Sequence, residues 1–315
     1  MYINATGYYI PTTRIPNDYF SDVNGLSSDW ILQRTGISSR SRATEKETIE
    51  YMCSEAVANA LPKLPYKIDD IDLIIFASYT PSDTIATVGH KIQREYNILN
   101  AKVFQISSAC SSAVNAMEII YTFFASQTAS KALLICADRN STYSDDSDCM
   151  SGHLWGDGAV AFFFSNTSYS NKDAEILDIT TQGLGHIGMG PQSVYLDPKN
   201  EGLQMPYGKD VFLYACSYIT QNTRDIVENN GYSLDNLSFF IGHQANMRIL
   251  RNVTKQLNIK EDVILSNIGE LGNTGSASSL LVYAQNIDKF QSGNLICISV
   301  FGGGYSSGAC LLRIP

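Results

Sequence analysis

An internal repeat is the feature of the sequence that most constrains its fold. The segment Asp-Asp-Ile-Asp-Leu-Ile-Ile-Phe at 69–76 recurs as Asp-Asn-Leu-Ser-Phe-Phe-Ile-Gly at 235–242, which begins 166 residues later. At the same separation, Ser276 corresponds to Cys110. Self-similarity of this kind indicates two copies of one supersecondary unit that bury a common core. The sequence therefore predicts two halves of equal topology related by a pseudo-twofold axis.

Both copies alternate buried strands with amphipathic helices, which predicts an α/β fold. Continuous apolar runs such as 131–137 and 294–300 are typical of strands that are covered on both faces. The stretch 165–173 is rich in Asn, Ser and Thr and breaks the apolar pattern. We therefore divide the chain into residues 1–170 and 171–315, two halves that fold around one merged core.

Cys110 lies where a predicted strand passes into a predicted helix. Val103, Phe104 and Ile106 follow a strand pattern, and a helical spacing of apolar residues begins at Ser111. The unpaired N–H groups and the macrodipole at a helix N-terminus favour a thiolate. The pattern thus favours a nucleophilic cysteine, with a small core cysteine as the alternative.

Two polar residues and a glycine run occupy the corresponding region of the second half. His243 follows the apolar segment 235–242 and starts a predicted helix, whose N-terminus is expected to keep the imidazole neutral. Asn273 stands in the turn sequence Gly-Asn-Thr-Gly, and three glycines after Phe301 let backbone N–H groups approach an oxyanion. Because equivalent strand-end loops converge on the pseudo-axis, we expect Cys110 to meet His243 and Asn273. Taken singly, each feature has a structural alternative: a core histidine, a turn asparagine or an ordinary β-turn.

Charge and cysteine spacing argue against several classes of protein. A net charge of −9 without a Lys/Arg run argues against nucleic-acid binding. Seven irregularly spaced cysteines with no Cys-x-x-Cys pair indicate neither a disulfide framework nor a zinc site. No signal-peptide pattern and no apolar run of transmembrane length occur, so we expect a cytoplasmic protein without membrane association. The Gly- and Pro-rich stretch 183–209 is expected to cap a site.

Several short motifs are informative as an ordered set. They are Cys110 in Ser-Ala-Cys-Ser, His243 in His-Gln-Ala-Asn-Met-Arg, Asn273 in Gly-Asn-Thr-Gly and Phe301 in Phe-Gly-Gly-Gly. Together with the Trp-x-x-x-Arg-Thr-Gly-Ile sequence at 30–37 and the Trp-Gly-Asp-Gly-Ala sequence at 155–159, the set resembles the β-ketoacyl-acyl carrier protein synthase III family over essentially the whole chain. The resemblance implies a thiolase fold, in which two duplicated halves form a five-layer αβαβα core.

By that resemblance, Cys110 is the nucleophile that takes an acyl group from a thioester. His243 and Asn273 would hold the thioester carbonyl of a malonyl group on an acyl carrier protein and stabilise the enolate formed as carbon dioxide leaves. The backbone N–H groups of Cys110 and Gly303 would form the oxyanion hole. The implied reaction is a decarboxylating Claisen condensation that initiates fatty-acid synthesis and gives 3-oxoacyl-acyl carrier protein. No cofactor would be bound permanently, because coenzyme A and phosphopantetheine thioesters are substrates.

The resemblance also implies binding surfaces and an assembly. Positions that match coenzyme A or pantetheine contacts are Trp30, Arg34, Thr35, Gly208, Phe212, Ala245 and Asn246. Positions that match contacts with an acyl carrier protein are Gln244, Arg248, Arg251 and Lys255. The three basic residues among them suit an acidic partner. A homodimer is implied, with pairing through 101–107 and with Ile85 reaching the acyl tunnel across the interface.

Two departures from the family pattern bear on the acyl donor. Cys149 stands where the family usually has an arginine that stacks on adenine, which makes a carrier-bound donor an alternative to acyl-coenzyme A. Ile85 stands where short-chain members often have phenylalanine, which suggests a roomier pocket and a primer longer than acetyl. Two other functions stay open: a specialised synthase III-like condensing enzyme or acyltransferase of secondary metabolism, and a non-catalytic subunit that binds a carrier protein.

Overall fold

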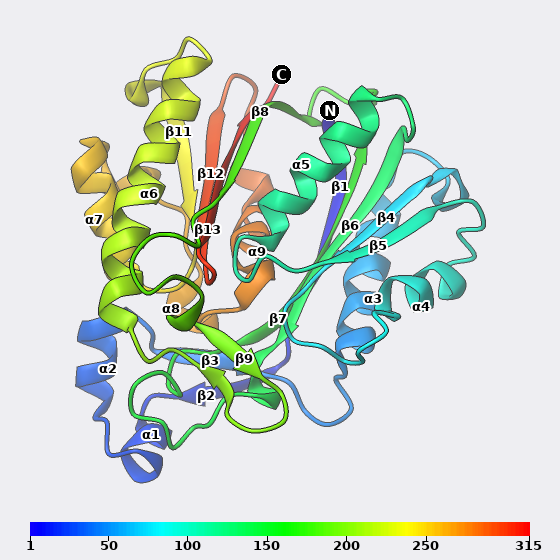
Figure 1. Cartoon of the computed structure of the whole chain (residues 1–315). Helices are drawn as coiled ribbons and strands as arrows, with labels where there is room; N and C mark the ends of the chain where they lie inside the picture. The colour runs from blue at the N-terminus through cyan, green and yellow to red at the C-terminus, as the bar shows by residue number, and fades with distance from the viewer.

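Nine strands form one continuous hydrogen-bonded sheet in the computed structural model, which describes residues 1–315 (Figure 1). The order across the sheet is β11-β12-β13-β8-β1-β7-β6-β4-β5. The strands are β1 (Tyr2–Tyr9), β4 (Leu73–Ala77), β5 (Lys102–Ile106), β6 (Lys131–Arg139), β7 (Asp157–Ser165), β8 (Ala174–Gly183), β11 (Leu237–Gly242), β12 (Leu295–Gly302) and β13 (Ser306–Arg313). Strands β6 and β7 are buried along almost their whole length, as their continuous apolar runs predict.

The pattern of strand pairing is repeated across the sheet. In the first half β4 runs parallel to β6, whereas β6 with β7 and β7 with β1 are antiparallel. In the second half β11 runs parallel to β12, whereas β12 with β13 and β13 with β8 are antiparallel. The two sets meet where Tyr2 and Ile3 of β1 pair with β8. Residues 166–173 connect the two sets, and the division at residue 170 stays a prediction within this connection.

Helices lie on both outer faces and between the two halves. The longer helices are α3 (Ile49–Ala60), α4 (Val88–Glu95), α5 (Ser112–Ala125), α6 (Gly208–Asn229), α7 (Met247–Leu257) and α9 (Ser278–Gln285). Helices α3 and α4 pack on strands of the first half, and α6 packs on strands of the second half and on α7. Helices α5 and α9 contact strands of both halves (Figure 1). The result is the predicted αβαβα layering, with the two β layers joined into one sheet by β1 and β8.

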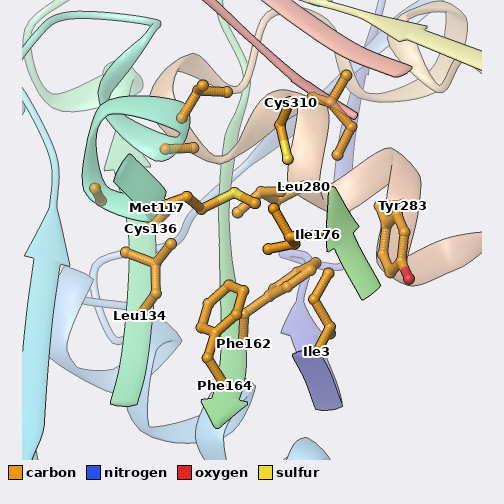
Figure 2. Packing of buried hydrophobic residues seen from close by; sticks show 14 of the residues in the cluster. Ile3, Met117, Leu134, Cys136, Phe162, Phe164, Ile176, Leu280, Tyr283 and Cys310 are labelled. Atoms are coloured by element: carbon orange, nitrogen blue, oxygen red, sulfur yellow. The ribbon is translucent and has the colours of Figure 1, made fainter. Parts of the chain in front are cut away.

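The two central helices are held in a shared apolar cluster of 32 buried residues (Figure 2). Met117 of α5 and Leu280 of α9 both enter this cluster, together with Phe162 of β7 and Ile176 of β8. Two further clusters lie beneath the outer helices of each half. Burial of apolar surface on both faces of the sheet fixes the positions of the loops that follow the strands.

Shorter elements surround the loops that carry the candidate site. They are β2 (Thr13–Pro16), α1 (Asp18–Val23), α2 (Ser28–Thr35), β3 (Ser39–Arg42), β9 (Tyr195–Asp197), β10 (Gly202–Gln204) and α8 (Ile268–Leu271). Strands β9 and β10 form a hairpin within 183–209, the stretch predicted to cap a site. None of the helices combines the length and the apolar character needed to cross a membrane.

Candidate active site

Cys110, His243 and Asn273 line one cavity. They come from three segments: the turn after β5, the end of β11 and the loop after α8. Most of the remaining wall is apolar, and it includes Trp155 and the main chain of Gly303. The fold thus brings Cys110 to two residues that lie more than 130 positions further along the sequence, as the convergence of strand-end loops predicts.

Cys110 lies in a tight turn between β5, which ends at Ile106, and α5, which begins at Ser112. The preceding Ala109 has a φ of 49°, a left-handed conformation that is unfavourable for a residue with a side chain. The turn leaves Cys110 only 7% exposed. Gly302 of the second half closes over it, because a Cβ atom at Gly302 would lie 2.8 Å from the backbone nitrogen of Cys110. This close approach requires glycine at the end of β12.

Burial raises the pKa of the Cys110 thiol to about 12. The nearby Asp138 carboxylate raises this pKa as well, whereas a hydrogen bond with the Tyr79 hydroxyl lowers it. The prediction that the helix N-terminus favours a thiolate is therefore wrong for the resting protein, because the loss of solvation dominates. The thiol of the resting protein is therefore protonated at pH 7.

His243 is a buried, neutral imidazole that directly follows β11. It is 5% exposed, and its Nδ1 lies 2.9 Å from Oγ of Ser278, the first residue of α9. Burial lowers the pKa of this imidazole to about 4. The prediction that His243 starts a helix is wrong, because α7 begins at Met247 and is capped by Asn246. The neutral state follows from burial, not from a helix dipole.

Asn273 offers an amide donor to the cavity. It is 4% exposed, and its Oδ1 accepts a hydrogen bond of 3.0 Å from the backbone nitrogen of Gly275. Its main chain forms a bridge beside Trp155: Asn273 N donates to Leu154 O at 2.8 Å, and Gly156 N donates to Asn273 O at 2.9 Å. The side-chain Nδ2 has no acceptor in the protein, so it can donate to a bound ligand.

A polar network beside these residues was not predicted from the sequence. The Tyr79 hydroxyl, which lies near the Cys110 thiol, donates to Asn140 Oδ1 at 2.8 Å. Asn140 Nδ2 donates in turn to Gly156 O at 2.7 Å and to Asn273 O at 3.2 Å. These bonds link the loop after β4 to the loop of the asparagine. The positions of Tyr79 and Asn140 in the sequence could have indicated this network. Tyr79 follows β4 and Asn140 follows β6, and these two parallel strands end at one edge of the sheet.

The predicted coenzyme A contacts in α2 differ in their accessibility. Trp30 is 39% exposed, and the guanidinium of Arg34 lies 5.5 Å from its ring centroid. Asn246 Nδ2 donates to Arg34 O at 3.1 Å, which ties α2 to the start of α7. Thr35 is buried, and its hydroxyl donates to Ile31 O within α2, so this side chain is not available at the surface.

A basic groove crosses α7 beside the start of α6. Arg248, Arg251 and Lys255 are exposed and border the groove together with Phe212. The guanidinium of Arg248 lies 5.6 Å from the ring centroid of Phe212, a cation–π contact that holds the arginine in place. These predicted positions therefore form one continuous surface.

Gln244 does not belong to that surface. It is fully buried, its Nε2 donates to Gly242 O at 2.6 Å, and its Oε1 accepts from Ser266 Oγ at 2.6 Å. The prediction that Gln244 contacts a carrier protein is wrong, because both ends of its amide hold the loop between β11 and α7.

The remaining predicted positions lie at the cavity or on the surface. Ala245 lines the cavity, and Gly208 borders a surface groove together with Met150. Cys149 is exposed. Ile85 is 82% exposed, on the loop between β4 and α4, and it does not line the cavity of its own chain.

Sequence comparison assigns the chain to a family. The family model described as 3-Oxoacyl-[acyl-carrier-protein (ACP)] synthase III matches residues 104–185, and its C-terminal counterpart matches residues 227–314. A beta-ketoacyl-[acyl-carrier-protein] synthase III of Clostridium botulinum (strain Kyoto / Type A2) is 32% identical, over 96% of this chain and 95% of that protein.

Structural comparison agrees with the sequence comparison. The crystal structure of 3-oxoacyl-[acyl-carrier-protein] synthase III from Aquifex aeolicus VF5 has a TM-score of 0.92 at 31% identity, with 99% of both chains covered. The priming β-ketosynthase from the R1128 polyketide biosynthetic pathway has a TM-score of 0.90 at 27% identity, with 99% of this chain and 96% of that chain covered. The predicted thiolase fold is confirmed. The chain belongs to the beta-ketoacyl-[acyl-carrier-protein] synthase III family of acyl-transferring condensing enzymes.

The raised pKa of Cys110 predicts a characteristic pH dependence of alkylation. In a Cys149→Ser variant, which lacks the exposed thiol, the rate of Cys110 modification by iodoacetamide should rise about tenfold per pH unit between pH 7 and pH 10. The reason is that a thiol with a pKa of about 12 is almost wholly protonated throughout this range. Peptide mass spectrometry locates the modified cysteine. A rate that levels off near pH 9 would show an unperturbed thiol and contradict this account.

Proposed function

We propose that this protein is a β-ketoacyl-acyl carrier protein synthase III that initiates fatty-acid synthesis. Its reaction is the decarboxylating Claisen condensation of an acyl thioester with malonyl-acyl carrier protein, which gives 3-oxoacyl-acyl carrier protein. One observation carries the proposal: a thiol, a neutral imidazole and a free amide N–H group line the same cavity. We place the enzyme in the cytoplasm, without a permanently bound cofactor.

The first half-reaction transfers an acyl group to Cys110. The Sγ atom attacks the thioester carbonyl carbon, the carbon–sulfur bond of the donor breaks, and the thiol proton ends on the released thiol. Backbone N–H groups of Cys110 and Gly303 face the developing oxyanion in our proposal. Gly302 supports this arrangement, because its backbone approaches the nitrogen of Cys110 closely.

The second half-reaction uses two donors that carry no charge. His243 Nε2 and Asn273 Nδ2 would donate to the thioester carbonyl of the malonyl group. Donation from the Ser278 hydroxyl to Nδ1 would place the imidazole proton on Nε2. As the bond to the carboxylate breaks, these donors stabilise the enolate oxygen, and the enolate carbon attacks the acyl group on Cys110. The Cys110 thiolate leaves as the carbon–carbon bond forms and takes up a proton from solvent.

The groove of Arg248, Arg251 and Lys255 fits an acidic acyl carrier protein. Its positive charge is local in a chain of net charge −9, so it gives the carrier a defined approach to the cavity. Pantetheine would enter past Trp30, Arg34 and Asn246. Because Cys149 stands where the family usually has an arginine, a carrier-bound acyl donor is an alternative to acyl-coenzyme A.

We also propose a homodimer that is paired through β5. This strand is at the edge of the sheet and is only half-buried, and Phe104 on it is 43% exposed. Pairing across a twofold axis would cover this edge and bring the exposed Ile85 to the acyl tunnel of the other subunit.

One alternative has a specific observation in its favour. The priming β-ketosynthase of a polyketide pathway is 27% identical, and Cys149 departs from the expected arginine. A specialised synthase or acyltransferase of secondary metabolism would use the same cavity with another acyl donor. The presence of Cys110, His243 and Asn273 in one cavity argues against a non-catalytic subunit.

Variants at the three residues should separate the half-reactions. Cys110→Ala should abolish the acyl-enzyme, whereas His243→Ala and Asn273→Ala should each retain acylation and lose about 10²–10³-fold in decarboxylation of malonyl thioester. Intact mass measures the first step, and carbon dioxide release measures the second. Acylation is the folding control for the latter two variants. Native decarboxylation in either of them would refute its assigned role.

Charge reversal in the basic groove should impair only the reaction with the carrier-bound substrate. Arg248→Glu should raise KM for malonyl-acyl carrier protein, with a smaller effect as the salt concentration rises, and should leave the rate with a small malonyl thioester unchanged. Lys289→Glu, a charge reversal at another exposed position, is the matched control. An equal loss of activity with both substrates would show that the substitution damages the active site and not the docking of the carrier protein.

Ile85→Phe should shift the preference of the enzyme towards shorter acyl donors. A filled pocket rejects each further methylene by about 1–3 kcal/mol, so we expect a graded change in the kcat/KM profile over chain length. Ile85→Val, which keeps the pocket open, is the control, and light scattering checks for the dimer. A monomer, or an unchanged profile in Ile85→Phe, would contradict the placement of Ile85.

A further inference from the structure

Trp155 lines the active-site cavity and carries a polar atom that nothing in the protein satisfies. The residue is 2% exposed and lines the same cavity as Cys110, His243 and Asn273. Its indole Nε1 is buried and has no hydrogen-bond partner. Buried N–H donors are almost always paired, so an orphan beside a substrate cavity indicates an acceptor that arrives with the substrate.

The main chain fixes Trp155 beside Asn273. The bridge between the two residues uses two hydrogen bonds, Asn273 N to Leu154 O at 2.8 Å and Gly156 N to Asn273 O at 2.9 Å. Gly156 packs so closely that a Cβ atom there would lie 1.9 Å from Leu271 O. Trp155 and Asn273 are therefore held as neighbours in the wall of the cavity.

Packing alone accounts for the ring but not for its nitrogen. The ring belongs to an apolar cluster with Ile37, Leu154, Leu203 and Ile268, where phenylalanine would make similar apolar contacts. The indole differs from a phenyl ring in polarity by a single N–H donor. A role for tryptophan at this position therefore lies in that donor.

We propose that the Trp155 indole N–H is a specificity-determining donor that binds the carboxylate of the malonyl group. This inference rests on the proposed function of the site. Asn273, the neighbour of Trp155, is assigned to the malonyl thioester carbonyl, and the carboxylate is the other acceptor on that group. The bond anchors the extender before reaction and is lost as the carbon–carbon bond breaks and the carboxylate leaves as carbon dioxide.

A donor of this kind strengthens binding of the malonyl group in the ground state at least as much as in the transition state. Trp155→Phe should therefore raise KM for malonyl thioester about ten- to one-hundredfold, the range expected for a hydrogen bond to a charged group. The kcat of decarboxylation should be unchanged or higher. Acylation of Cys110 by an alkyl thioester, measured by intact mass in the same variant, should match the wild type and reports the integrity of the cavity.

Fluorescence gives a second measurement, in which the indole of Trp155 is retained. The chain has two tryptophans, so a Trp30→Phe variant leaves Trp155 as the sole indole fluorophore. An amide-linked malonyl pantetheine should shift its emission, whereas the acetyl analogue, which lacks the carboxylate, should not.

An unchanged malonyl KM in Trp155→Phe would overturn the inference, as would equal emission changes with both analogues. Parallel loss of acylation and decarboxylation would also overturn it, because that result identifies the ring as structural support. Failure of the proposed function would give a different result from failure of this inference, because the wild-type protein would then neither acylate Cys110 nor release carbon dioxide.

Discussion

The close approach of β12 to the nucleophile turn is the contact on which the site depends. Gly302 lies so near the turn that a Cβ atom would be 2.8 Å from Cys110 N and 2.9 Å from Ser111 N. This contact joins the second half of the chain to the first and closes the cavity around the thiol. The shared cluster around α5 and α9 maintains it, because both helices pack on strands of both halves.

Closure of the cavity sets the protonation state of its groups. Burial raises the pKa of Cys110 and lowers that of His243, so the resting site holds a thiol and a neutral imidazole at pH 7. Asn273 adds a donor that does not titrate. A cavity lined by neutral donors suits a reaction in which negative charge appears on an enolate oxygen and carbon dioxide leaves. The protein groups that line the cavity thus carry no charge before the substrate binds.

The sequence predicts more of the fold than of the electrostatics. The repeat predicts the matched strand pairings, and α9 begins at Ser278, 166 residues after α5 begins at Ser112. Strand-end positions also predict that Cys110 meets His243 and Asn273. The local sequence pattern does not predict the protonation state of Cys110, because its loss of solvation comes from long-range contacts such as that of Gly302.

Side-chain partners were likewise not predictable from local sequence. Gln244 follows His243 directly, yet its amide is consumed by Gly242 and Ser266, a residue 22 positions away. Tyr79 and Asn140 carry no local sequence signal of their roles, and only the packed strand ends show that they form a hydrogen-bonded connection to the Asn273 loop. Hydrogen-bond partners far apart in the sequence are decided by tertiary structure.

The most direct test of the central claim is a single-turnover time course on the unmodified protein. Acyl donor is added first, malonyl-acyl carrier protein second, and the mass of the protein is followed together with released carbon dioxide. The account predicts an acyl adduct on Cys110 that disappears as one equivalent each of carbon dioxide and 3-oxoacyl product is formed. Condensation without an adduct on Cys110, or an adduct that persists without release of carbon dioxide, would contradict it.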